Sequence, residues 1–216
     1  MTARLIKSTT LTLVIVLWGS VGWASTRSNI LVLGDSISAA YGIQREEGWV
    51  ALLEERLQSQ NAGWQVVNAS VSGETTSGGL ARLPTALATH NPGVVVIELG
   101  GNDGLRGYPI KRVQANLDAL VEIAQADGRQ VLLVGMQIPP NYGPRYTQAF
   151  AGMFTEIAKK RRVAVVPFLL DGVVFEPNMI QDDGIHPTAL AQPALLENVW
   201  PTLLAMLGAT PSSSAD

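Results

Sequence analysis

The sequence contains no cysteine, and this absence excludes several kinds of chemistry at once. Disulfides, thiol nucleophiles, Cys-ligated zinc and iron–sulfur clusters all require that residue. Acylation of a cysteine, which anchors some exported proteins to lipid, is excluded as well. The fold therefore depends on its hydrophobic core, and covalent catalysis would need another nucleophile.

Histidine and positive charge are also scarce. The chain has two histidines, His90 and His186, so we expect no multi-histidine metal site. Fifteen basic residues against eighteen acidic ones give a net charge of −3. Because nucleic-acid binders hold the phosphate backbone with a basic face, we expect no nucleic-acid partner.

Apolar residues are abundant. They make up 47% of the 216 residues, whereas charged residues make up 15%. This composition is too apolar for a disordered chain, and the length fits one domain with a sizeable core.

The first residues have the pattern of a secretory signal peptide. Arg4 and Lys7 precede an uncharged segment, 8–26, with an apolar centre at 11–18, and small residues precede a cleavage point after Ala24. An uncleaved membrane anchor is the alternative, since this segment is just long enough to span a bilayer. Its interspersed threonines and glycines favour the signal peptide. We therefore predict a signal peptide (1–24), one domain (25–209) and a flexible tail (210–216). The mature protein is expected in the periplasm or secreted, without stable membrane insertion.

Short β-rich segments alternate with segments of helical period in the rest of the chain. The strands are expected at 29–33, 65–69, 94–99, 130–136 and 163–168, and the helices at 49–60, 77–90, 110–126, 145–161 and 188–207. Continuous Val, Ile and Leu runs are typical of strands covered on both faces. The alternation predicts an α/β fold, a three-layer α/β/α sandwich with a five-stranded parallel sheet in the flavodoxin-like order 2-1-3-4-5.

Nearly all the unusual residues follow the predicted strands. Segments 34–38, 70–74, 100–104 and 182–187 combine Gly, Asp, Ser, Asn and His. Taken singly, each has an ordinary explanation as a turn or a helix cap, and 100–104 alone reads as a flexible loop. In parallel sheets, however, the loops that leave the carboxyl ends of the strands build the functional site.

Together these loops contain the parts of a serine hydrolase. A serine needs a base to take its proton and a third group to orient that base. Asp183, three residues before His186, can reach the imidazole Nδ1 and leave Nε2 to face a serine. Gly73 can offer an unobstructed backbone N–H and Asn102 an amide to stabilise an oxyanion. His90 ends a predicted helix on the side of the sheet opposite the strand exits, so we interpret it as a surface or C-terminal-turn histidine that interacts favourably with the helix dipole.

The same segments resemble the four blocks of the SGNH (GDSL-type) hydrolase family. These blocks are Gly34-Asp35-Ser36, Gly73, Gly101-Asn102-Asp103 and Asp183-Gly184-Ile185-His186. Further segments at 67–70, 79–84, 98–107, 140–143 and 181–187 are similar to the branch of thioesterases, lysophospholipases and arylesterases, and the resemblance spans about residues 29–207.

The resemblance implies hydrolysis of acyl esters and thioesters through an acyl-serine intermediate. It makes Ser36 the nucleophile, His186 the acid/base and Asp183 the residue that orients the histidine. The N–H of Ser36 joins Gly73 and Asn102 in the oxyanion hole. We expect no cofactor and no metal, and the expected partner is a small acyl ester or thioester.

Loops 104–109 and 138–142 flank the predicted serine and supply apolar surface. We therefore expect Leu105 and Ile138 to bind the acyl chain, although both loops could equally be ordinary crossings. The alternatives in function are a short-chain carbohydrate esterase, an acyltransferase using the same residues, or a non-catalytic lipid- or carbohydrate-binding domain.

Overall fold

The computed structural model of the chain describes residues 28–208. The predicted signal peptide (1–24) and tail (210–216) lie outside the described residues. Within 28–208, no helix has both the length and the apolar character needed to cross a bilayer.

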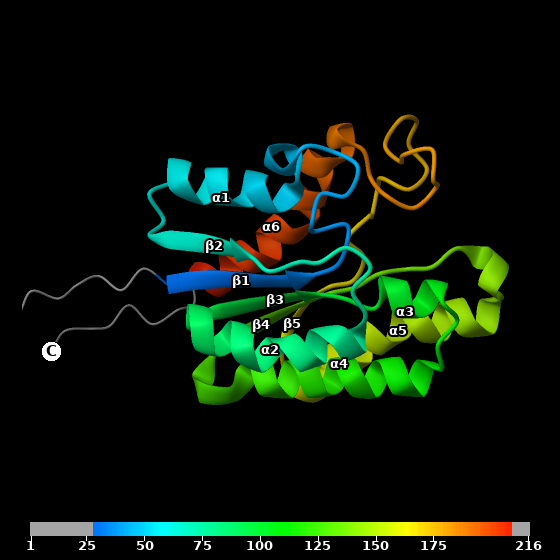
Figure 1. The fold of residues 1–216 in the computed structure, drawn as a ribbon, viewed down its shortest axis with the longest axis horizontal. Coiled ribbons are helices and arrows are strands. Elements are labelled where there is room, and N and C mark those ends of the chain that lie inside the picture. The colour runs from blue at the N-terminus through cyan, green and yellow to red at the C-terminus, as the bar shows by residue number, and fades with distance from the viewer. Residues whose placement is uncertain (1–27, 209–216) are drawn as a thin grey trace, which may run out of the picture.

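The centre of the molecule is a five-stranded parallel sheet (Figure 1). Its strands run in the order β2-β1-β3-β4-β5, and each neighbouring pair is parallel. Their bounds are β1 Ser28–Gly34, β2 Trp64–Asn68, β3 Val94–Glu98, β4 Gln130–Val134 and β5 Ala164–Val166. The predicted fold class and strand order are confirmed. The register places Gly34, at the end of β1, beside Glu98, at the end of β3.

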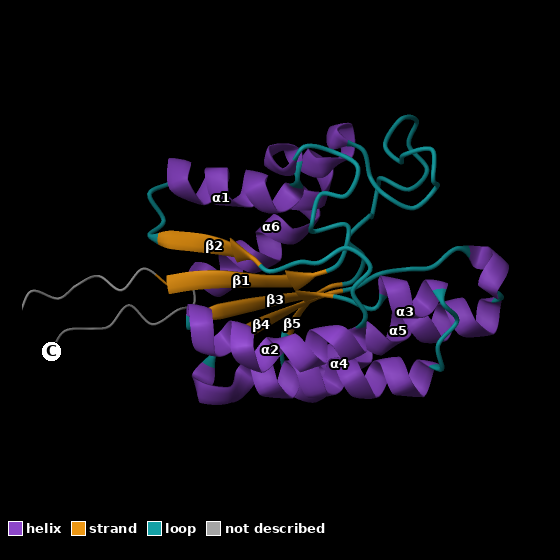
Figure 2. Cartoon of the chain, in the orientation of Figure 1, coloured by secondary structure: helices purple, strands orange, loops and turns teal. Residues whose placement is uncertain are grey.

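Helices cover both faces of this sheet (Figure 2). On one face lie α1 (Trp49–Ser59) and α6 (Gln192–Gly208), and on the other α2 (Thr76–His90), α4 (Ile110–Gln125) and α5 (Pro144–Arg161). Short 3-10 turns occur at Arg45–Glu47, Ala126–Gly128, Pro140–Tyr142 and Ala189–Ala191. The three-layer sandwich expected from the alternation is therefore present.

Hydrophobic periodicity explains why these helices pack as they do. Along α4, the apolar positions recur every three or four residues and form one stripe that is fully buried: Val113, Leu117, Leu120, Val121 and Ala124. The strands are buried on both faces instead, and every residue of β3 is inaccessible to solvent. Buried helix stripes and doubly covered strands together make one continuous core.

The structure differs from the sequence expectation after β3. Segment 100–104 was expected as a loop, but Gly101–Leu105 forms a short helix, α3. Glycine lowers helix propensity, which is why the three glycines there predicted a loop. Tertiary contacts outweigh propensity at this point, because the Asp103 carboxylate accepts bonds from the backbone N–H (2.9 Å) and the hydroxyl (2.7 Å) of Thr76 at the start of α2. The last helix also begins later than expected, at Gln192, after a 3-10 turn.

An ion pair joins α4 to α5 and gives a prediction about stability. Arg161 binds Asp118 through two nitrogens, at 2.7 and 2.6 Å. The hydrogen bonds from Arg161 lower the pKa of Asp118 to about 2 from its usual 3.8, against the opposing effect of burial. We expect Asp118→Asn to lower the free energy of unfolding at pH 7 by about 1 kcal/mol.

The pH dependence follows from the sign of this shift. A carboxylate with a lowered native pKa stabilises the fold above its unfolded pKa, and this contribution is lost as the pH falls toward 2. Denaturant titrations should therefore show the largest difference in free energy of unfolding between wild type and Asp118→Asn at pH 7. This difference should shrink between pH 4 and pH 2. Asp127→Asn, which alters an exposed ion pair with Arg129, should change stability by less than about 0.5 kcal/mol. Equal effects of the two variants would contradict the prediction.

Candidate active site

Ser36 lies in the turn that follows β1, at the carboxyl edge of the sheet. The turn is closed by two backbone bonds, from the N–H of Ala39 to the carbonyl of Asp35 and from Tyr41 to Ser36. A buried carboxylate, Glu98, holds it from the neighbouring strand, accepting bonds from the Asp35 N–H (3.2 Å) and the Ser38 hydroxyl (2.7 Å). The serine is 8% exposed, so its hydroxyl sits in a fixed turn with limited access to solvent.

The second part of the site is the loop between β5 and α6. His186 Nε2 lies 2.8 Å from Ser36 Oγ, and its Nδ1 lies 2.6 Å from Asp183 Oδ2. The other carboxylate oxygen of Asp183 accepts the backbone N–H groups of Ile185 and His186, at 2.9 and 3.0 Å. A ring with its proton on Nδ1 fits both contacts, because Nδ1 then donates to Asp183 and Nε2 accepts from the serine.

Hydrogen bonds of Gln181 link this loop to the serine turn. Its backbone N–H donates to the carbonyl of His186 (2.8 Å). Its side-chain amide donates to the carbonyls of Tyr41 and Pro187, both at 2.9 Å. The ring of Tyr41 itself lies 4.5 Å from that of His186, centroid to centroid. The imidazole is thus held by its neighbours on the ring face as well as by Asp183.

Gly73 lies on the loop after β2 and Asn102 on helix α3, and these two segments flank the serine turn. Gly73 has φ +79°, a conformation that glycine adopts without strain, and its carbonyl accepts a bond from Arg106 at 3.2 Å. Within residues 28–208, neither its N–H nor that of Ser36 donates to a protein acceptor. The Asn102 amide on α3 donates to Asp35 Oδ2 at 3.2 Å. Two backbone donors and one side-chain donor therefore belong to the segments around Ser36.

Three carboxyl groups at the site have altered acidity. Burial raises the pKa of Asp35 to about 6, although bonds from Ile37 and Asn102 work against it. Burial and the nearby Asp35 carboxylate raise the pKa of Glu98 well above its ordinary value. Burial also acts to raise the pKa of Asp183, but hydrogen bonds from His186 and Ile185 outweigh it and lower the pKa to about 2. Asp183 is thus ionised at neutral pH, as a partner of imidazolium has to be.

The two residues expected to bind the acyl chain have different surroundings. Leu105, the last residue of α3, is half-buried, and its carbonyl accepts the Tyr142 hydroxyl at 2.7 Å. Ile138 is 7% exposed and packs in the core, where a β-carbon added at Gly104 would lie 2.7 Å from its Cγ2. Leu105 thus has accessible surface beside the site, whereas the buried Ile138 packs against α3 at Gly104.

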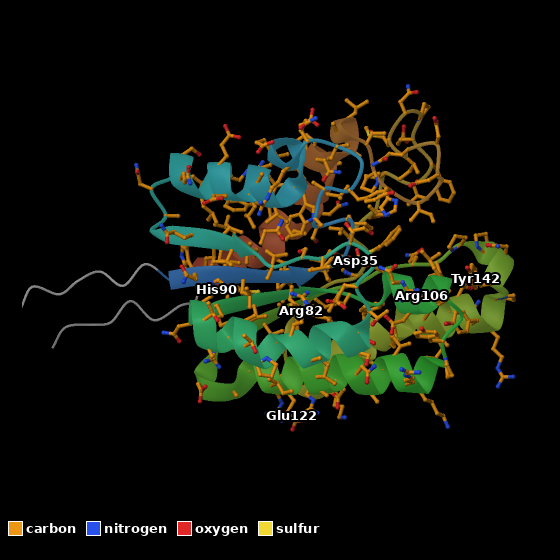
Figure 3. All side chains as sticks on the ribbon, in the orientation of Figure 1. Asp35, Arg82, His90, Arg106, Glu122 and Tyr142 are labelled. Carbon is orange, nitrogen blue, oxygen red and sulfur yellow. The ribbon has the colours of Figure 1, made fainter. Side chains whose placement is uncertain are left out.

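His90 lies near the amino end of the strands, opposite the end at which the candidate site lies. It is the last residue of α2, and Asn91 ends the helix in a left-handed conformation, φ 40°. Figure 3 shows His90 near the start of β1 and Asp35 at the end of that strand. Its backbone carbonyl accepts a bond from Asn29 at 2.7 Å. Its predicted place at a helix terminus, far from the loop cluster, is confirmed.

Several residues that hold the site were not found from the sequence. Glu98 had a local signal, because a glutamate that ends the otherwise apolar strand Val94–Glu98 has to find polar partners once buried. The contacts of Tyr41, Gln181 and Arg106 had none, since they join segments far apart in the chain, although Gln181 and Arg106 lie in segments that resemble the family. Among the residues that the structure describes, no group of three or more His, Asp or Glu side chains is arranged to hold a metal ion.

Comparison with known proteins decides the family. Residues 32–192 match the model of the GDSL-like lipase/acylhydrolase family. This chain belongs to that family. The chain is similar to esterase TesA of Pseudomonas aeruginosa, with 55% identity over 178 residues, which are 82% of this chain and 89% of the relative. Thioesterase 1/protease 1/lysophospholipase L1 of Escherichia coli K12 is 41% identical over 174 residues, 81% of this chain and 82% of the relative.

A solved structure is similar over most of the chain. The psychrotrophic esterase EstA from Pseudoalteromonas sp., inhibited by monoethylphosphonate, superposes with a TM-score of 0.80 at 41% identity, covering 84% of this chain and 99% of its own. Family membership makes the chain an acyl ester hydrolase, and the fold and resemblance predicted from the sequence are confirmed.

Proposed function

We propose that the chain hydrolyses acyl esters and thioesters through an acyl-serine intermediate, with Ser36 as nucleophile, His186 as acid/base and Asp183 as the residue that orients it. The observation that carries the proposal is the chain of two hydrogen bonds, 2.6 Å from Asp183 to His186 and 2.8 Å from His186 to Ser36. A serine hydroxyl reacts only when a base removes its proton, and these contacts fit a base that carries its own proton on Nδ1.

In acylation, Ser36 Oγ attacks the substrate carbonyl carbon while His186 Nε2 takes the hydroxyl proton. The tetrahedral intermediate then breaks its bond to the leaving alcohol or thiol, which receives that proton from Nε2. In deacylation, water gives a proton to Nε2, attacks the acyl-serine and releases the acid, and the proton returns to Ser36. Asp183 remains ionised throughout and stabilises the imidazolium that forms in each half-reaction.

The developing oxyanion needs preorganised donors. The N–H groups of Ser36 and Gly73 and the amide of Asn102 are the three candidates, on the turn after β1, the loop after β2 and α3. Because the backbone donors have no acceptor within residues 28–208, they are available to the substrate oxygen. Donors of this kind are each worth about 10²–10³ in kcat in acyl-transfer enzymes.

The substrate class follows from the relatives together with the site. The relatives described above carry the names esterase and thioesterase/protease/lysophospholipase, and their alignments span 82% and 81% of this chain. We therefore propose aryl esters, acyl-CoA thioesters and lysophospholipids as substrates. The phosphonate inhibition named for the solved esterase fits the same chemistry, since organophosphonates react with an activated serine.

Leu105 gives the proposal a test of specificity. Because its half-buried side chain lies at the end of α3, we expect Leu105→Ala to lower kcat/KM for long-chain p-nitrophenyl esters by about 10-fold and to change acetate turnover by less than about 3-fold. Leu204→Ala, at an exposed leucine of α6, should leave kcat/KM unchanged for every p-nitrophenyl ester of the series. Ile138→Ala is expected to destabilise the fold by about 2–5 kcal/mol, because that side chain is buried. Unchanged kinetics of Leu105→Ala across the series would remove it from the acyl site.

We further propose that the enzyme is exported and works in the periplasm. The basic start, the apolar centre and the small residues Gly22 and Ala24 before the expected cut support a cleaved signal peptide. A chain without cysteine also tolerates an oxidising compartment.

The experiment that tests the function combines turnover with labelling. Purified protein is assayed on p-nitrophenyl esters from acetate to palmitate, on an acyl-CoA and on a lysophospholipid, with and without EDTA. A fluorophosphonate is then added and the modified peptide identified by mass spectrometry. We expect turnover that EDTA does not change and one label per chain, on Ser36. A folded protein without turnover, or a label elsewhere, would contradict the proposal.

A further inference from the structure

Tyr41 places an exposed aromatic ring beside the base. Its ring lies 4.5 Å from that of His186, centroid to centroid, with 40° between the two planes. The residue is nevertheless 51% exposed, and its hydroxyl makes no hydrogen bond within residues 28–208. Part of the ring therefore packs against the imidazole, whereas the exposed part is accessible to a substrate bound at the site.

Hydrogen bonds on both sides of Tyr41 hold its backbone in place. Its N–H donates to the carbonyl of Ser36 at 3.0 Å, and its carbonyl accepts the side-chain amide of Gln181 at 2.9 Å. The next residue, Gly42, has φ +78°, and a β-carbon there would collide with the Gln181 side chain. The ring is thus carried by a fixed segment, so a group that stacks on it has to order little of the protein.

The proposed chemistry determines where the leaving group lies. The substrate carbonyl oxygen faces the N–H of Gly73 and the amide of Asn102, whereas the leaving oxygen or sulfur has to receive a proton from His186 Nε2. That transfer requires a hydrogen bond, so the leaving atom lies within about 3 Å of Nε2. Figure 1 shows the loop between β5 and α6, which carries His186, on the α1 and α6 side of the sheet and α3 on the other side. The alcohol or thiol part of the substrate is therefore the part that lies near Tyr41.

We propose that Tyr41 is a specificity-determining residue that contacts the leaving group and favours a flat aromatic alcohol or thiol over an aliphatic one. The inference rests on the proposed acyl-serine mechanism, which assigns the leaving atom to His186. Two aromatic rings attract each other in offset or edge-to-face arrangements by more than their buried area accounts for. An aliphatic leaving group of the same size lacks this attraction, so the contact distinguishes esters by the shape and electronic character of their alcohol.

Two substitutions at position 41 separate the ring from the hydroxyl. Tyr41→Leu keeps an apolar side chain but removes the aromatic ring. We expect it to lower the ratio of kcat/KM for phenyl butyrate to kcat/KM for ethyl butyrate by about 5- to 10-fold, the loss of one aromatic pair. Tyr41→Phe should keep this ratio within about 2-fold of wild type, because the hydroxyl has no partner to lose. Circular dichroism and thermal midpoints establish that each variant is folded.

The matched control is Phe175→Leu, which also replaces an aromatic residue by leucine. Phe175 lies on the same loop as His186 and is 97% exposed, and its ring stacks on no other ring in the described part of the chain. The ratio for Phe175→Leu should equal that of the wild type. A change as large as that of Tyr41→Leu would assign the preference to the loop in general and overturn the role of Tyr41.

The deciding experiment compares phenyl, cyclohexyl and ethyl butyrates by pH-stat titration of the released acid. These esters share one acyl group, and kcat/KM covers only the steps up to the acyl-enzyme, so a difference between them reports the leaving group. Tyr41→Leu should reduce kcat/KM for the phenyl ester about 5- to 10-fold more than for the other two. Equal losses on all three esters would show that Tyr41 acts only by holding the imidazole, and equal losses on the phenyl and cyclohexyl esters would replace the aromatic preference by a preference for bulk. Either result overturns the inference while leaving the hydrolase intact. A wild-type protein that neither hydrolyses these esters nor takes up fluorophosphonate on Ser36 would instead overturn the mechanism on which the inference rests.

Discussion

Ser36→Ala is expected to lower kcat on p-nitrophenyl esters by about 10⁶-fold, as removal of the nucleophile does in other serine hydrolases. The change deletes one buried oxygen, and alanine fits the turn that the Asp35 and Glu98 carboxylates hold. His186 then has no hydroxyl within reach of Nε2, and the residual rate comes from the oxyanion donors and substrate binding. Single-turnover and steady-state assays of highly purified protein would measure the loss.

The matched control for this variant is Ser59→Ala, at the end of α1, whose hydroxyl bonds only to the carbonyl of Arg56 within the described residues. It should retain full activity and react with the fluorophosphonate. Ser36→Ala should take up no label while keeping the wild-type thermal midpoint. A folded Ser36→Ala protein with more than about 1% of wild-type kcat would assign the nucleophile to another residue.

Asp183→Asn is expected to lower kcat by about 10⁴-fold, the cost of holding the catalytic imidazole in the wrong tautomer. The structure dictates how the asparagine would be oriented. Its oxygen has to face the N–H groups of Ile185 and His186, which now bond to Oδ1. Its NH2 group is then directed at His186 Nδ1, which can accept that bond only without a proton. The proton moves to Nε2, and the ring can no longer accept from Ser36.

Asp182→Asn makes the same change of charge one residue earlier. Asp182 is exposed, and no hydrogen bond joins its side chain to the described part of the chain. The activity of Asp182→Asn should stay within about 2-fold of wild type, since surface charge changes away from the reacting atoms have small effects. Steady-state kinetics would give the rate of each variant, and the histidine proton resonances in NMR spectra would show which ring nitrogen carries the proton. Similar losses in the two variants would point to the charge of the loop instead of the Asp183–His186 bond.

The sheet was predictable because its strands carry their signal locally. Five short runs of Val, Ile and Leu separated by helical periods leave few arrangements, and right-handed crossovers select among them. Helix α3 was missed for the opposite reason. Gly100, Gly101 and Gly104 argue against a helix locally, and the bonds from Thr76 to Asp103 that support it join residues 27 positions apart.

Some contacts of the site could likewise be predicted from nearby residues, whereas others depend on segments far apart in the chain. Asp183 and His186 are three residues apart, so their bond could be expected from spacing, and the edge of the sheet on which they would meet Ser36 followed from the topology. The contacts of Tyr41 with His186 and of Arg106 with Gly73 could not, because loop conformations determine them. Local spacing thus indicates which groups react, whereas the folded loops determine how each is oriented.

The bond between Ser36 and His186 joins residues 150 positions apart, and this separation affects when the chain gains activity. The sheet is complete at Val166, so a growing chain can assemble its central layer while the base is still missing. Under the proposed mechanism, hydrolytic capacity arises only after the segment that carries His186 has docked against the turn near the start of the domain. Contacts between such distant segments form late, because closing a long loop costs entropy before any bond repays it. Recovery of activity after denaturation is therefore expected to report the completion of folding more strictly than recovery of secondary structure does.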